Sequence, residues 1–299
     1  MKQIVKALVL LCLPAAANAN SFIGIGQFQS EFFGSEYDRS YESDVNTIRQ
    51  LSFGYKDRNL AELFGDVRLD EDNKIRDFAL GFALKEKLIR IERGKISGKI
   101  VDDEGPVIGT FNNEYRRIDI IDREGDSDGF MFGVGLQQYS APHLFEYNDG
   151  SKYLGQMLQD DKLSITSIGI GFYYDPIYNY MMSNKQGFIS DWYFSTSTLA
   201  ISLAYAKASN AEELKARGVD GRDWFLWGNS GTYELGWFWG HKAPMFSATF
   251  NIGYHIRANT FMNINPAELF ADEADPNDIA LSGHQTILHG PAAALNISF

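Results

Sequence analysis

Histidines are the side chains of this chain best suited to acid–base chemistry near neutral pH. A catalytic histidine needs a nucleophile or a carboxylate within hydrogen-bond reach, and no His-x-Ser or Asp-x-His pair occurs in the sequence. If the segment around His255 is a strand, Ser247 lies roughly 27 Å away along it, so a partner must come from another strand. We expect His255 to line a polar lumen, with a catalytic base as the alternative. The histidines are His143, His241, His255, His284 and His289.

Carboxylates could bind a cation in two places. The segment REGDSDG (Arg123–Gly129) carries acidic residues at alternate positions, as in the first half of a calcium-binding loop. The twelfth position of such a loop would be Gly135, where glutamate is required. The acidic segment Asp272–Asp278 has no better pattern. We therefore predict polar connections between strands in both places, and no metal or cofactor.

Aromatic side chains could stack on sugars or lie at a membrane interface. We expect an interfacial girdle, because an amphipathic ring suits the headgroup level. The same expectation holds for the aromatic run Phe172–Tyr180, interpreted as a strand end. Trp224 and Trp227, which lie near a predicted loop, are the best candidates for stacking on a ligand. The tryptophans are Trp192, Trp224, Trp227, Trp237 and Trp239.

The first 19 residues have the pattern of a secretory signal peptide. Two lysines precede an apolar run, and Ala17 and Ala19 form a small-x-small cleavage site. The apolar run is about half the length of a membrane-spanning helix, which argues against an N-terminal anchor. Residues 20–299 would then form one domain. Cys12, the single cysteine, lies within the signal, so the mature chain would have no disulfide and no thiolate site.

Composition narrows the class of protein. The chain has 27 Lys and Arg residues against 39 Asp and Glu residues, and a net charge of −12. This charge argues against nucleic acid as a partner, because phosphate binding needs a basic surface. The 28 glycines, 22 phenylalanines and 15 tyrosines suit an apolar outer band with aromatic girdles better than an ordinary soluble core.

Apolar and small or polar residues alternate along many segments of about 9 to 13 residues, which is the length of a tilted strand that crosses a bilayer. In Phe246–Arg257 the even positions are apolar and the odd positions are small or polar. In Phe22–Phe33 the same pattern places Gln27, Gln29 and Glu31 opposite a row of phenylalanines. A soluble sandwich would also alternate, but its strands would be shorter.

The chain ends on a strand with apolar residues at alternate positions and a terminal phenylalanine. Leu295, Ile297 and Phe299 form this pattern. It resembles the C-terminal assembly signal of Gram-negative outer-membrane β-barrels. The resemblance implies an all-β, transmembrane, antiparallel up-and-down barrel in the bacterial outer membrane, whose last strand pairs with its first. About twelve strands, with ten or fourteen as alternatives, suit the length.

The resemblance also implies a function and partners. We expect a porin-like passage for small hydrophilic solutes. The alternatives are an embedded hydrolase acting on lipid or peptide, and a non-conducting surface or structural barrel. Enzyme activity is the less favoured class. Expected partners are outer-membrane lipid, lipopolysaccharide, the barrel-assembly machinery and periplasmic chaperones. The expected lumen-lining residues are Gln27, Gln29, Glu31, Lys56, Lys85, Glu234, His255 and Arg257.

Overall fold

The computed structural model describes twelve segments of the chain. They are residues 20–36, 39–42, 45–57, 61–84, 86–101, 107–123, 129–142, 162–183, 186–208, 223–243, 246–264 and 283–298. The predicted cleavage residues Ala17 and Ala19, the terminal Phe299, Lys85 and His143 lie outside the described residues, as do residues 124–128 and 265–282.

Strands make up nearly all of the described chain. Their bounds are β1 Asn20–Glu36, β2 Arg39–Glu42, β3 Asn46–Lys56, β4 Ala61–Leu69, β5 Ile75–Leu84, β6 Lys87–Val101, β7 Val107–Asp122, β8 Met131–Pro142, β9 Lys162–Tyr174, β10 Gly187–Ala208, β11 Asp223–Ala243, β12 Phe246–Asn263 and β13 Gly283–Ser298. One helix, α2, spans Pro176–Met182. No helix in the described segments is both long and apolar enough to cross a membrane.

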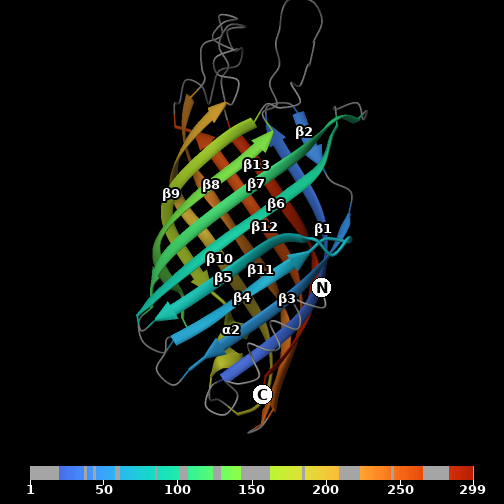
Figure 1. Cartoon of the computed structure of the whole chain (residues 1–299), viewed down its shortest axis with the longest axis vertical. Coiled ribbons are helices and arrows are strands. Elements are labelled where there is room, and N and C mark those ends of the chain that lie inside the picture. The colour runs from blue at the N-terminus through green and yellow to red at the C-terminus, as the bar shows by residue number, and fades with distance from the viewer. Residues whose placement is uncertain are drawn as a thin grey trace, which may run out of the picture.

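The strands form a closed barrel (Figure 1). Every neighbouring pair is antiparallel, and β13 pairs with β1 from Ser298 beside Phe22 to Gln285 beside Ser35. At this junction a side chain on Gly290 would overlap the backbone carbonyl of Gln29, so the two strands require glycine there. Without the short strand β2, the described strands form a closed ring of twelve, which confirms the predicted number and the up-and-down arrangement.

The wall is uneven in height. The strands β3, β4 and β5 have 11, 9 and 10 residues, whereas β10 and β11 have 22 and 21. Beyond the short strands, β2 pairs with β1 on one side and with β6 on the other, and so fills the wall above them (Figure 1). We call the end with the C-terminus of β13 the lower end, and the opposite end the upper end.

The outer face is apolar over the lower part of the barrel. Across β5 to β9, consecutive register partners form a row that is between 37% and 54% exposed. Exposed apolar rows that continue across five strands would be unfavourable in water and suit the hydrocarbon of a bilayer. The protein is therefore a transmembrane barrel. The row consists of Leu80, Ile91, Ile118, Leu136 and Ile168.

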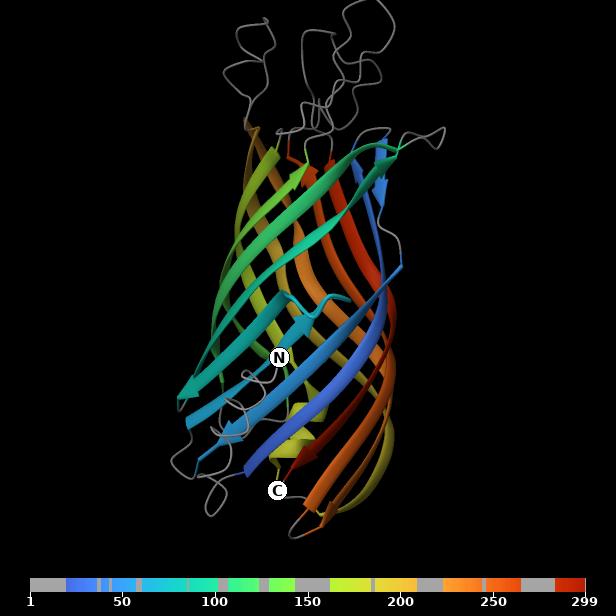
Figure 2. The same cartoon turned by 45° about the vertical axis from the view of Figure 1, so that its right-hand side comes forward.

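Helix α2 lies inside the lower end of the barrel (Figure 2). Asp175 caps it by accepting a hydrogen bond from the Tyr178 amide at 2.9 Å, and Pro176 occupies the first turn. Both are favourable at a helix start. The prediction that Phe172–Tyr180 is a strand end with girdle residues is therefore wrong beyond Tyr174, because Asp-Pro ends the strand and begins a helix.

Strand β10 contains a bulge between Leu199 and Ser202, where its register shifts against both neighbours. Ile201 has a φ of 48°, which is unusual for a β-branched residue, and its side chain is 71% exposed. The bulge inserts one residue and turns Leu199 inward, where it is fully buried.

Candidate functional site in the barrel interior

Four of the predicted lumen-lining residues point into the barrel. They are Lys56, Glu234, His255 and Arg257, all of which contact other interior side chains. Lys85 lies outside the described residues.

The other three predicted lumen residues lie on the opposite face. Gln27, Gln29 and Glu31 are exposed, whereas Phe28 and Phe32 on the same strand are 2% and 1% exposed and pack inside. The face assignment of β1 was therefore inverted. The physical reason is that the interior next to β1 is itself apolar, so large side chains on this strand do not mark the lipid side.

Buried charges cross the barrel at mid-height. Glu92 on β6 forms ion pairs with Arg90 on its own strand and with Arg257 on β12, the latter at 3.2 Å. Arg257 also donates to the Tyr115 hydroxyl at 2.8 Å, and Arg90 to the Ser197 hydroxyl at 2.6 Å. One carboxylate thus joins two arginines in a desolvated interior, where each charge depends on its partners.

A second buried ion pair lies beside the first. Arg117 Nε is 2.8 Å from Asp119 Oδ1, and both side chains are 1% exposed. The same guanidinium donates to the backbone carbonyl of Ser197 at 3.1 Å, which lies across the barrel on β10. The interior ion pairs therefore connect β6 and β7 to the opposite wall.

Neutral polar side chains continue the network toward β13. Gln137 accepts a hydrogen bond from Ser230 at 2.6 Å and donates to Asn259 at 3.3 Å. Asn259 donates to Thr286 at 2.9 Å, and Thr286 also accepts from Tyr139 at 3.2 Å. These bonds satisfy polar groups that have no access to bulk water.

The predicted histidine has a carboxylate partner. His255 Nδ1 lies 3.3 Å from Glu234 Oε2 on the neighbouring strand β11. Tyr193 donates to the other oxygen of Glu234 and accepts a bond from Asn251 at 3.1 Å. Among the described residues, no hydrogen bond joins His255 to a serine or threonine hydroxyl. The His255–Glu234 pair therefore has a base and a carboxylate that orients it, but no nucleophile beside the base.

Helix α2 is bonded to the barrel wall at two places, its C-terminus and Tyr178. Lys242 donates to the carbonyls of Met181 and Tyr180, at 2.8 and 3.1 Å, near the helix C-terminus. The Tyr178 hydroxyl donates to Glu62 at 2.9 Å, and Glu62 is paired with Lys56 at 2.9 Å. At the other end, burial raises the pKa of the Asp175 carboxyl to about 6, and backbone hydrogen bonds oppose this shift.

Two small cavities lie between α2 and the middle of the barrel, with volumes of about 110 and 80 Å³. Asp175 and Tyr178 line both of them, Glu234 and His255 the first, and Arg90 the second. These volumes hold a few water molecules. The described residues contain no group of three or more metal-ligating side chains.

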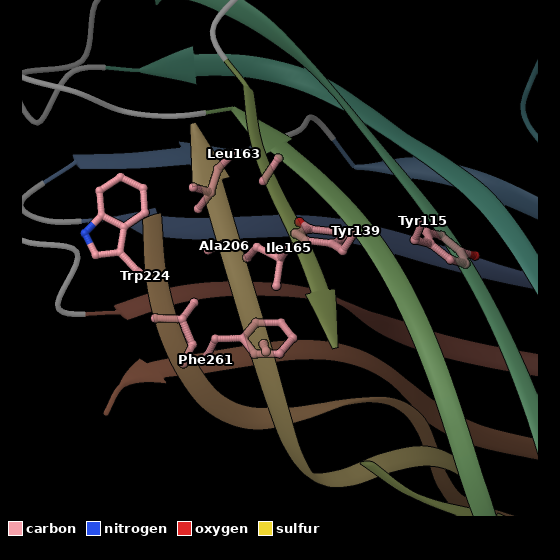
Figure 3. Close-up of a cluster of buried hydrophobic side chains, with 10 residues drawn as sticks. Tyr115, Tyr139, Leu163, Ile165, Ala206, Trp224 and Phe261 are labelled. Carbon is pink, nitrogen blue, oxygen red and sulfur yellow. The ribbon is translucent and has the colours of Figure 1, made fainter. Parts of the chain in front are cut away.

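An apolar cluster fills the interior toward the upper end (Figure 3). Trp224, one of the two predicted stacking candidates, belongs to it and is 3% exposed, so it is neither a girdle residue nor an accessible ligand platform. The other four tryptophans are between 37% and 63% exposed on the outer face. The cluster consists of Tyr115, Tyr139, Ala141, Leu163, Ile165, Ala204, Ala206, Trp224, Leu226 and Phe261.

Sequence reasoning missed the central ion pairs. On β6, Arg90 and Glu92 alternate with Ile89 and Ile91, so the charges point inward and the isoleucines outward. This Ile-Arg-Ile-Glu alternation was the signal that could have identified them.

Comparison with known proteins adds little. No protein-family model matches the chain, and no curated protein sequence matches it. Among solved structures, the outer membrane protease OmpT of Escherichia coli is 9% identical over 95% of this chain and 97% of its own, with a TM-score of 0.31. OmpT of Vibrio cholerae is 9% identical over 93% and 99%, with a TM-score of 0.28. OprD of Pseudomonas aeruginosa is 9% identical over 93% and 94%, with a TM-score of 0.20. Likenesses this low carry no argument, and the barrel is established by its own strand register.

Proposed function

We propose that this protein is an outer-membrane barrel that is closed to solutes and serves as a structural or surface-recognition protein. The observation that carries the proposal is the burial of interior side chains at every level. Asp119 and Tyr139 are fully buried, and Leu226 toward the upper end is as well. A water-filled pore would leave its lining side chains accessible.

The outer-membrane location rests on physical grounds. The apolar outer rows need lipid, and a closed antiparallel barrel leaves no unpaired strand edge in hydrocarbon. Barrels of this type belong to outer membranes. Proposed partners are outer-membrane lipid and lipopolysaccharide, the barrel-assembly machinery and periplasmic chaperones; nucleic acid is not among them.

Passage of small hydrophilic solutes is the second candidate. Helix α2 favours it, because the helix fills the lower end and borders the two cavities. Displacement of α2 would join these cavities to the solvent at the lower end. Lys56, Glu234, His255 and Arg257 would then contribute both signs of charge to the passage. No comparable observation favours an embedded hydrolase, since the cavity beside His255, about 110 Å³, is too small for a lipid or a peptide chain.

Planar-bilayer conductance separates the first two candidates. We expect the wild-type barrel, once inserted, to give no discrete current steps. A variant lacking residues 176–183 should also stay silent, because the charged and apolar layers above α2 remain. Steps from the wild type would refute a closed barrel. Steps from the deletion variant alone would favour a passage controlled by α2. Heat-modifiable migration on a gel verifies that each variant is folded.

A further inference from the structure

Two arginines lie side by side on the outer face of the barrel, and neither has a carboxylate partner among the described residues. Arg93 on β6 and Arg116 on β7 are direct register partners, and both are exposed. Directly opposed residues on one face of an antiparallel pair have Cβ atoms about 4.5–5.5 Å apart, and like charges at this spacing are destabilising. No ion pair to either arginine occurs within the described segments, so their shared charge calls for an external anion.

The neighbouring rows give the position of this pair. One step below lie Ile91 and Ile118, which belong to the apolar outer row. One step above lie Lys95 and Glu114, which form an ion pair of 2.7 Å with each other. The two arginines therefore occupy the first polar row beyond the hydrocarbon-facing surface, while the charges above them are already paired.

The strand next to Arg116 places a polar residue beside the arginine pair, and the strand next to Arg93 places an apolar residue there. Gln138 on β8 is the register partner of Arg116 and is exposed. Phe78 on β5 is the partner of Arg93. A phosphate held between the arginines would thus have an amide beside it and apolar surface directly below, where acyl chains attached to that phosphate would lie.

We propose that Arg93 and Arg116 bind the phosphate of a membrane lipid whose acyl chains pack on the isoleucine row below. This inference rests on the proposed outer-membrane location. Arginine is suited to the role, because its planar guanidinium group donates paired, charge-assisted hydrogen bonds to phosphate oxygens. The pair lies at mid-height, next to Glu92 along β6, and on the upper side of the isoleucine row. The connections between strands are longer at the upper end than at the lower end, as they are on the extracellular side of outer-membrane barrels. Lipid A, the phosphorylated glycolipid anchor of lipopolysaccharide, has the required chemistry.

The test compares lipid binding by native mass spectrometry of the full chain folded in detergent. The probes are lipid A and its dephosphorylated form. The double variant R93Q/R116Q should bind lipid A about tenfold more weakly than the wild type, which corresponds to about 1.4 kcal/mol. The matched control K87Q/K207Q also loses two exposed positive charges, far from the pair, and should bind as the wild type does. The wild type should prefer lipid A to the dephosphorylated form.

Three results would overturn the proposal. They are equal binding of lipid A by R93Q/R116Q and wild type, equal binding of the two lipids by the wild type, and full displacement of lipid A by millimolar inorganic phosphate, which would identify a general anion site. In phosphate-free detergent the double variant should unfold at the same or higher urea concentration, since a like-charge contact is removed. A lower midpoint would assign the pair a structural role.

Insertion is measured separately, by heat-modifiable migration after addition to phosphatidylcholine vesicles. A chain that inserts but shows no phosphate preference contradicts the lipid site alone. A chain that does not insert contradicts the proposed location and the lipid site together.

Discussion

Glu92 offers the sharpest test of the buried ion pairs. Replacing it with alanine removes the carboxylate that is paired with both Arg90 and Arg257, in an interior where their exposed fractions are 7% and 4%. Removing one partner of a buried pair destabilises by about 3–5 kcal/mol, because a desolvated charge is left uncompensated. Here two charges are affected, so we expect the upper part of that range. Glu92→Gln keeps the shape and removes the charge, and should cost nearly as much.

The control lies on the adjacent strand. Glu114→Ala removes one partner of an exposed ion pair with Lys95, for which the expected cost is about 0–1 kcal/mol. Equilibrium urea unfolding of the barrel in lipid vesicles, followed by tryptophan fluorescence, measures both variants. If Glu92→Ala cost no more than Glu114→Ala, the interior would have to be hydrated, and the argument for a closed barrel would fail with it.

Two further predictions concern the lower end and the outer face. Because the folded pKa of Asp175 is raised to about 6 from an ordinary value of 3.8, its stabilising contribution is complete below about pH 4 and is lost as the pH rises through 6. The urea midpoint should therefore fall between pH 5 and pH 8 in the wild type and change less in Asp175→Asn; an identical pH dependence in both would contradict this assignment. On the outer face, Leu136→Arg should cost about 2–4 kcal/mol and Gln138→Arg about 0–1 kcal/mol in vesicles, and equal costs would show that the apolar boundary does not lie between these two residues.

The sequence was sufficient to predict the strands that form the wall of the barrel. Alternation predicted the strands because lipid imposes one strong rule, that the outer face is apolar over the bilayer. Segments such as Phe130–Leu136 and Phe246–Ile256 obey it on every second residue, and their exposed faces are as predicted. The number of strands followed from the chain length divided by the length of a membrane-crossing strand and its connection.

The interior could not be predicted by the same rule. A packed lumen has apolar regions of its own, so Phe28 and Phe32 turn inward beside Ile48 and Leu288, and the polar residues of β1 turn outward. Helix α2 replaces water at the lower end, although Asp175-Pro176 is a recognisable helix start. Which arginine meets which carboxylate depends on how the strands cross the barrel, and alternation along one strand carries no information about that.

The filled interior has a consequence for the order of folding. Its bonds join residues very far apart in the chain: Arg257 and Tyr115 are separated by 142 positions, Arg257 and Glu92 by 165, and Thr286 and Tyr139 by 147. Contacts between residues this far apart in the sequence form late, because the ends of a long chain segment must first be brought together. Core formation and closure of the last hairpin therefore coincide. Until β12 and β13 arrive, a half-assembled sheet must keep Glu92 and Tyr139 in contact with water or with a chaperone.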